Sequence, residues 1–111
     1  MDREMYSYNP PLNRVQYKAA RYYAMRYKEW FRELNYGNPD PERRQALDDH
    51  LELIKSTAKE ADPELYPWLM EYITSSNATY GILRAKTGVP CSAYTFNKSK
   101  RYFYYLLAKR M

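Results

Sequence analysis

The C-terminal third of the chain carries side chains that can bind a polyanion such as nucleic acid. Amide and hydroxyl groups can donate hydrogen bonds to base edges, whereas lysine and arginine can pair with phosphates. We expect base-edge contacts from Tyr94, Thr95 and Asn97, phosphate contacts from Lys98, Lys100 and Arg101, and anchoring on the nucleic-acid backbone from Arg84 and Lys86.

Other side chains offer less for chemistry. His50 and Cys91, each the only residue of its type, cannot supply the four ligands of a structural zinc site, and neither has an evident catalytic partner. The carboxylates of Asp48, Asp49 and Glu52 follow one helix surface and supply too few converging oxygens for a divalent cation. We therefore expect no metal, no cofactor and no enzymatic activity.

The chain has 14 tyrosines, whose rings could stack on unpaired bases. We expect most of them to be structural, because such rings commonly bury their body and leave the hydroxyl in water. Those expected to contact a ligand are Tyr94, Tyr104 and Tyr105.

Charge is unevenly distributed along the 111 residues, whose net charge is +5. Residues 1–32 hold seven cations and three anions, residues 33–75 hold four cations and ten anions, and residues 76–111 hold seven cations and no anion. Two basic regions separated by an acidic one favour binding to a polyanion. The alternative is a solvated basic surface without a ligand.

The N-terminal region predicts an extended arm over residues 1–12 and a long helix from Asn13 to about Leu34. At 100° per residue, one side of this helix is apolar and predicted to face the core: Val15, Ala19, Tyr23, Tyr27, Trp30 and Leu34. The opposite side is cationic and forms a second basic surface that contacts phosphates or an acidic partner: Arg14, Lys18, Arg21, Lys28 and Arg32.

In the rest of the chain, capping residues and prolines mark the ends of four further helices. The second helix begins at Asp40-Pro41 and buries Leu47, Leu51, Ile54, Ala58 and Ala61. The third begins at Pro63 or, because an internal proline removes a hydrogen-bond donor, at Pro67. A fourth spans Thr79 to Lys86 with Ile82 and Leu83 inward. The last begins between Ser92 and Phe96 and ends near Arg110, with Phe96, Ser99, Phe103, Leu106 and Leu107 on its buried side.

We predict an all-α fold of about five helices in a single domain over residues 1–111. A short helix, a turn at Gly88 and a longer basic helix are the components of a helix-turn-helix, here residues 79–110. Two long N-terminal helices would form an antiparallel support for it.

The run from Thr79 to Pro90, followed by Phe96 and the basic-aromatic segment 100–107, resembles the region-four helix-turn-helix of sigma factors. It is more similar to small phage-encoded transcriptional regulators, in which a Val-Pro-Cys-like turn precedes a Thr-Phe pair. Ser99 departs from this pattern, since a larger apolar residue is common there. The resemblance implies control of phage gene expression at a promoter.

The function we expect is sequence-selective binding of duplex DNA by a phage or mobile-element transcriptional regulator. The alternative is a protein-interaction module that binds RNA polymerase or a phage assembly component through the basic side of the first helix. An oligomer is compatible with either role. No segment is apolar enough to span a membrane, and we expect a cytoplasmic protein.

Overall fold

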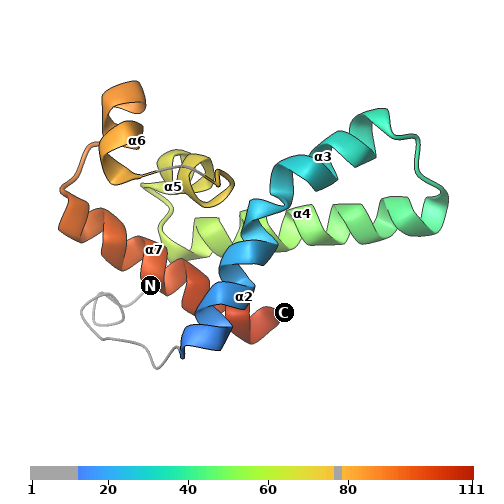
Figure 1. Cartoon of the computed structure of the whole chain (residues 1–111), viewed down its shortest axis with the longest axis horizontal. Helices are drawn as coiled ribbons and strands as arrows, with labels where there is room; N and C mark the ends of the chain where they lie inside the picture. The colour runs from blue at the N-terminus through green and yellow to red at the C-terminus, as the bar shows by residue number, and fades with distance from the viewer. Residues whose placement is uncertain (1–12, 77–78) are drawn as a thin grey trace.

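The computed structural model describes residues 13–76 and 79–111, and this part of the chain is helical without any strand, which confirms an all-α fold (Figure 1). Its helices are α2 (Arg14–Met25), α3 (Tyr27–Tyr36), α4 (Pro41–Ala61), α5 (Tyr66–Ile73), α6 (Tyr80–Thr87) and α7 (Ala93–Arg110). They correspond to the five predicted helices, with the first divided in two. The predicted arm, residues 1–12, lies outside the described residues.

The first predicted helix begins as expected but is divided at Arg26. The Asn13 side chain caps α2 by accepting a hydrogen bond of 2.8 Å from the backbone N–H of Gln16. At Arg26 the backbone N–H bonds to the carbonyl of Tyr23 at 3.2 Å, an i to i−3 contact that tightens the turn before α3. The division lets α2 pack on α7 while α3 packs on α4.

This division rotates the buried side of α2 relative to the predicted stripe. The prediction that Val15 and Ala19 face the core is wrong: both are exposed, Val15 by 77%. Ala20 and Ala24 are fully buried instead. The face of α2 is set by contact with α7, and small side chains at the contact allow two helices to approach closely.

α3 and α4 form a helical hairpin (Figure 1). The prediction of two long N-terminal helices that pair along their length is wrong, because α2 leaves this pair and packs on α7. The Asp40 side chain caps α4 by accepting a hydrogen bond of 2.8 Å from the backbone N–H of Arg43. The Arg43 guanidinium then binds both carboxylate oxygens of Glu33, at 2.7 and 2.8 Å. This hydrogen-bonded pair holds the pKa of Glu33 below its ordinary value.

α5 begins at Tyr66, so Pro67 lies in its first turn and Pro63 precedes the helix. Asp62 organises the junction with α4, because its Oδ1 accepts hydrogen bonds from the backbone N–H groups of Glu64 and Leu65, at 3.2 and 3.1 Å. The later of the two predicted starts is therefore nearly correct.

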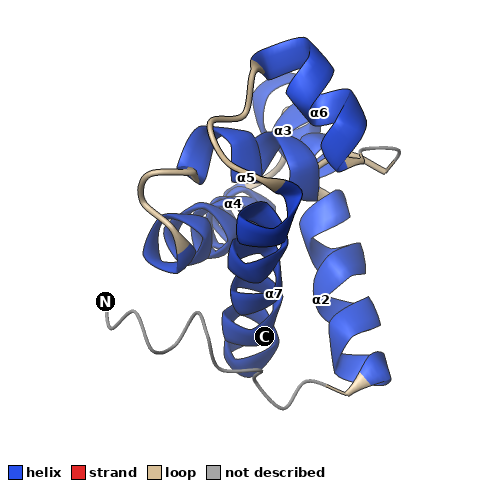
Figure 2. Cartoon of the chain, turned by 90° about the vertical axis from the view of Figure 1, so that its left-hand side faces the viewer, coloured by secondary structure: helices blue, strands red, loops and turns tan. Residues whose placement is uncertain are grey.

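The core lies around α7, which packs against α4, α2 and α5 (Figure 2). The predicted inward residues of α4 are all buried, as are Phe96, Ser99, Phe103 and Leu107 on α7, whereas Leu106 is half-buried. Tyr102 and Tyr104 are buried as well, so the C-terminal half of α7 is covered on most sides. Among the described residues, no helix combines the length and apolarity needed to cross a membrane.

Candidate nucleic-acid interface

α6 begins one residue later than predicted, because Thr79, predicted as its first residue, is the cap. The Thr79 hydroxyl caps α6 by accepting a hydrogen bond from the N–H of Ile82 at 3.2 Å. Gly88 ends α6 with φ 65° and ψ 49°, a left-handed conformation that glycine adopts at low cost. Val89 is buried, and Ser92 caps α7 by accepting a hydrogen bond from the N–H of Thr95 at 3.2 Å.

Contacts from α5 and α7 hold α6 in place. The Trp68 indole N–H on α5 donates to the carbonyl of Thr87 at 3.3 Å. The Tyr80 hydroxyl donates to the carbonyl of Cys91, and the Tyr80 ring lies 5.8 Å from that of Phe96. Leu83 is buried as predicted, but the inward placement of Ile82 is wrong, because its side chain is 49% exposed. One side of α6 therefore packs against α5 and the start of α7, and the remaining residues of the helix are exposed.

The outward face of α7 gathers four of the predicted residues, Tyr94, Asn97, Lys98 and Arg101, which we call the α7 face. Their spacing of three, four and seven residues places them on one side of a helix. All are exposed except Lys98, which is half-buried. The Lys98 ammonium lies 4.5 Å from the centroid of the Tyr94 ring, so the two side chains form a cation–π pair.

Two other predicted residues of α7 lie away from this face. Lys100 points to α5, where its ammonium donates to the Tyr72 hydroxyl at 3.3 Å and lies 4.8 Å from the centroid of the ring. The Thr95 hydroxyl lies 3.2 Å from that of Ser92 and so takes part in the cap of α7. The structure thus brings together four of the six predicted residues of α7 and leaves two at its margins.

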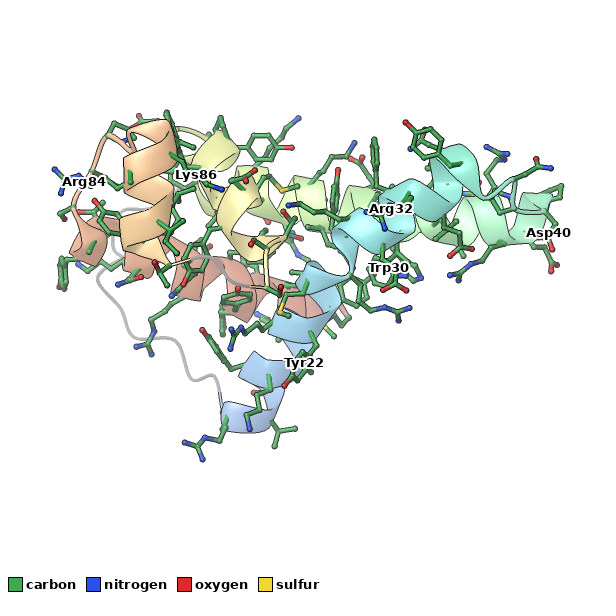
Figure 3. The ribbon with its side chains drawn as sticks, turned by 45° about the horizontal axis from the view of Figure 1, so that its top comes forward. Tyr22, Trp30, Arg32, Asp40, Arg84 and Lys86 are labelled. Carbon is green, nitrogen blue, oxygen red and sulfur yellow. The ribbon has the colours of Figure 1, made fainter. Side chains whose placement is uncertain are left out.

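The predicted anchors on α6, Arg84 and Lys86, are both exposed but point in different directions (Figure 3). Two residues correspond to about 200° of helix rotation, so side chains at this spacing cannot share a face. A ligand seated on one side of α6 would therefore meet one of these two cations at close range.

Tyr104 does not contribute to an exposed surface, contrary to the prediction that it contacts a ligand. Its side chain is buried, and its ring lies edge-on 5.0 Å from Tyr17 and 5.2 Å from Phe103. Burial raises the pKa of its hydroxyl above the ordinary tyrosine value. Tyr105 is half-buried, with the Lys109 ammonium 5.1 Å from its ring centroid.

The second basic surface is divided by the break at Arg26. Its five cations are all exposed, but three of them, Arg14, Lys18 and Arg21, belong to α2, and the other two, Lys28 and Arg32, belong to α3. Because the two helices run in different directions and pack on different partners, the structure does not support one continuous basic strip.

Residues outside the predicted set position the α7 face. The Ser99 hydroxyl donates to Oδ2 of Asp62 at 2.6 Å, and Tyr72 packs edge-on against Phe96 with 5.4 Å between ring centroids. In the sequence, Ser99 stands out because it is a polar residue on the apolar side of α7. Its partner, 37 residues earlier, has no such signal.

Cys91 and His50, the two residues considered for other chemistry, have structural surroundings. Burial, with the nearby charge of Asp62, raises the pKa of the Cys91 thiol and thereby lowers its reactivity. His50 stacks on Trp30 with 4.4 Å between ring centroids, and its Nδ1 lies 2.8 Å from the Tyr23 hydroxyl. Among the described residues, no group of three or more His, Cys, Asp and Glu side chains could hold a metal ion.

Comparisons of the chain with protein-family models, with curated proteins and with solved structures gave no match.

Proposed function

We propose that this protein binds duplex DNA in a sequence-selective manner, with the N-terminal half of α7 in the major groove. The observation that carries the proposal is the α7 face, in which an amide, a phenol and two cations share one exposed side of a helix. The B-DNA major groove admits an α-helix, and helix-turn-helix proteins read bases with the N-terminal residues of the inserted helix.

The position of α7 in the fold is compatible with such docking. Its first turns lie at one end of the molecule, below α6 and away from α2 (Figure 1). The buried rings of Phe96 and Phe103, seven residues apart, fix the rotation of the helix. A rigid scaffold reduces the ordering cost of binding. Because α2 and α4 pack against the C-terminal half of α7, we assign the DNA contacts of this helix to residues 94–101.

Chemistry divides the roles within the α7 face. The Asn97 amide can pair with adenine, and Tyr94 can donate its hydroxyl to a base edge. Lys98 and Arg101 supply positive charge for phosphates, and Arg101 can also bind guanine with two hydrogen bonds. Residues 76–111 contain no acidic residue, so no carboxylate of this segment opposes the approach of a phosphate.

Lys100, Thr95, Arg84 and Lys86 take secondary positions in this proposal. Lys100 can reach a phosphate only if its ammonium leaves the Tyr72 hydroxyl. Thr95 can contact DNA only while its hydroxyl takes part in the cap of α7. Arg84 and Lys86 flank α6 as alternative backbone anchors. The role of a phage or mobile-element transcriptional regulator is supported by the resemblance of residues 79–110.

Binding to a library of duplexes at several salt concentrations tests the proposal. A DNA reader should show a preferred sequence together with an affinity that falls with salt, because phosphate contacts release counterions. Arg101→Ala should weaken binding to the preferred sequence by about 1–3 kcal/mol. Arg44→Ala, which removes an exposed arginine of α4, is the matched control and should change little. Equal binding by Arg101→Ala, Lys98→Ala and the parent protein contradicts the proposal.

A further inference from the structure

The outward side of α3 carries a shallow open depression of about 310 Å³, whose lining among residues 13–76 and 79–111 comes from α3 alone. It is lined by Tyr27, Lys28, Phe31, Arg32 and Tyr36. Phe31 is 48% exposed and Tyr36 is 82% exposed, which is unusual for large rings in one patch. Exposed apolar patches rimmed by polar groups mark interaction sites.

The depression lies between two rows of side chains. Tyr27 and Phe31 form one row, with their rings nearly parallel and 6.4 Å apart between centroids. Lys28, Arg32 and Tyr36 form the other, at the same spacing of four residues. A groove bordered by i, i+4 rows is the surface into which a ridge of a second helix packs.

The cations of this face are not paired with either acidic residue of α3. Both acidic residues of α3 already have partners: Glu29 lies 3.3 Å from Arg26, and Glu33 lies 2.7 Å from Arg43. Lys28 and Arg32 have no ion-pair partner among the described residues. The depression is therefore apolar in its lining and positive at its border.

From this arrangement we infer that α3 docks an acidic amphipathic helix of another protein. An aliphatic or aromatic side chain of that helix fills the depression against Phe31, and its carboxylates pair with Lys28 and Arg32. Aromatic and arginine side chains dominate the binding energy of protein interfaces, and both types border this depression. The inference is independent of DNA binding, because α7 contributes nothing to this face.

The same features disfavour two other occupants. A second copy of the chain would bring its own Lys28 and Arg32 to the contact, and like charges at an interface oppose association. A single strand of nucleic acid needs a track of several cations. Among the described residues, only two cations, Lys28 and Arg32, border this depression.

Selection from a displayed library of random peptides of about 16 residues, long enough to form a helix, tests this inference. The full chain serves as bait. Peptides that also bind the double variant Lys28→Glu/Arg32→Glu are removed by counter-selection. We expect enriched peptides to combine acidic residues with bulky apolar residues three or four positions apart. Their affinity should fall about tenfold or more in Phe31→Ala, the loss typical of a central interface residue.

Ile82→Ala is the matched control, because Ile82 on α6 is 49% exposed, nearly the same as Phe31. It should leave peptide affinity unchanged. The inference is overturned if no peptide survives counter-selection, if enriched peptides are basic, or if Phe31→Ala binds them as the parent does. Binding of oligo(dT), or self-association, that depends on Phe31 would also overturn it. DNA affinity of Phe31→Ala should equal that of the parent, so the two proposals fail separately.

Discussion

The Ser99 hydroxyl donates a hydrogen bond of 2.6 Å to Oδ2 of Asp62, which ties the middle of α7 to the junction between α4 and α5. Ser99 is buried, and the other carboxylate oxygen of Asp62 accepts two backbone N–H groups. One side chain thus fixes both the start of α5 and the position of α7. The α7 face depends on this connection for its orientation.

Ser99→Ala should lower the free energy of unfolding by about 1–3 kcal/mol, because it removes a hydrogen bond to a charged group and leaves that oxygen less well satisfied. Urea denaturation measures the change. Asp62→Ala should cost more, since it also frees the N–H groups of Glu64 and Leu65. In a double-mutant cycle the two changes should not add. Additive losses would mean that the Ser99–Asp62 contact does not contribute to stability.

Two phenylalanines, one buried and one exposed, test the division between core and surface. Phe103→Ala should lower the free energy of unfolding by about 3–5 kcal/mol, because the ring is fully buried and its loss leaves a cavity. Phe31→Ala, made on the exposed side of α3, should stay within about 0.5 kcal/mol of the parent. A loss below about 1 kcal/mol at Phe103 is incompatible with a register of α7 that buries this ring.

His50 should make stability depend on pH between about 7 and 5. Burial, and then the positive charges of Arg43 and Arg26, lowers its pKa, although Asp49 opposes the shift. The unfolded chain, with a histidine pKa near 6.5, therefore binds a proton before the folded chain does. Stability from this residue is complete above about pH 7, and it is lost as the pH falls from the ordinary histidine pKa through the lowered pKa of the folded chain.

Thermal denaturation between pH 7 and pH 5 measures this dependence, and His50→Gln is the control that should flatten it. Glu33, whose pKa is also lowered, affects a separate range, because its stabilisation is lost only below the ordinary carboxyl pKa of about 4.5. If parent and His50→Gln lose stability equally over this range, the titrating group is not His50.

Local signals predicted the helices better than the contacts between them. The caps Asn13 and Asp40 and the stop at Gly88 act within a few residues of the chain, and the structure has all three. In the sequence, no proline or glycine near Arg26 indicates a break. The break reflects the competing surfaces of α4 and α7, which only the folded chain presents together.

The same distinction explains the outcome at the candidate site. Helical spacing predicted five residues on one outward surface, and all but Thr95 share the α7 face, because one helix is enough to define it: Tyr94, Thr95, Asn97, Lys98 and Arg101. Tyr104 directly follows the buried Phe103, and the spacing within α7 leaves it off the predicted apolar side. It is buried because α2 closes over this side of α7, a contact that periodicity within α7 cannot reveal.

The break at Arg26 also allows the two parts of the basic surface to be tested against each other. Replacing Arg14, Lys18 and Arg21 together by Gln removes the cations of α2, and Lys28→Gln/Arg32→Gln removes those of α3. If the cations of α2 contact DNA phosphates, the triple variant should bind all DNA sequences more weakly by about the same factor. Its salt dependence should flatten by up to about 0.9 log unit for each phosphate that α2 no longer neutralises.

The α3 double variant should keep the DNA affinity and salt dependence of the parent, because we assign its cations to an acidic protein partner. Long-range attraction changes mainly association rates, so equilibrium affinity must be measured at several salt concentrations. An unchanged slope in the triple variant removes α2 from the DNA surface and leaves α6 and α7 to bind DNA alone. A flattened slope in the α3 double variant contradicts the separation of the two surfaces at Arg26, since both would then contact the same polyanion.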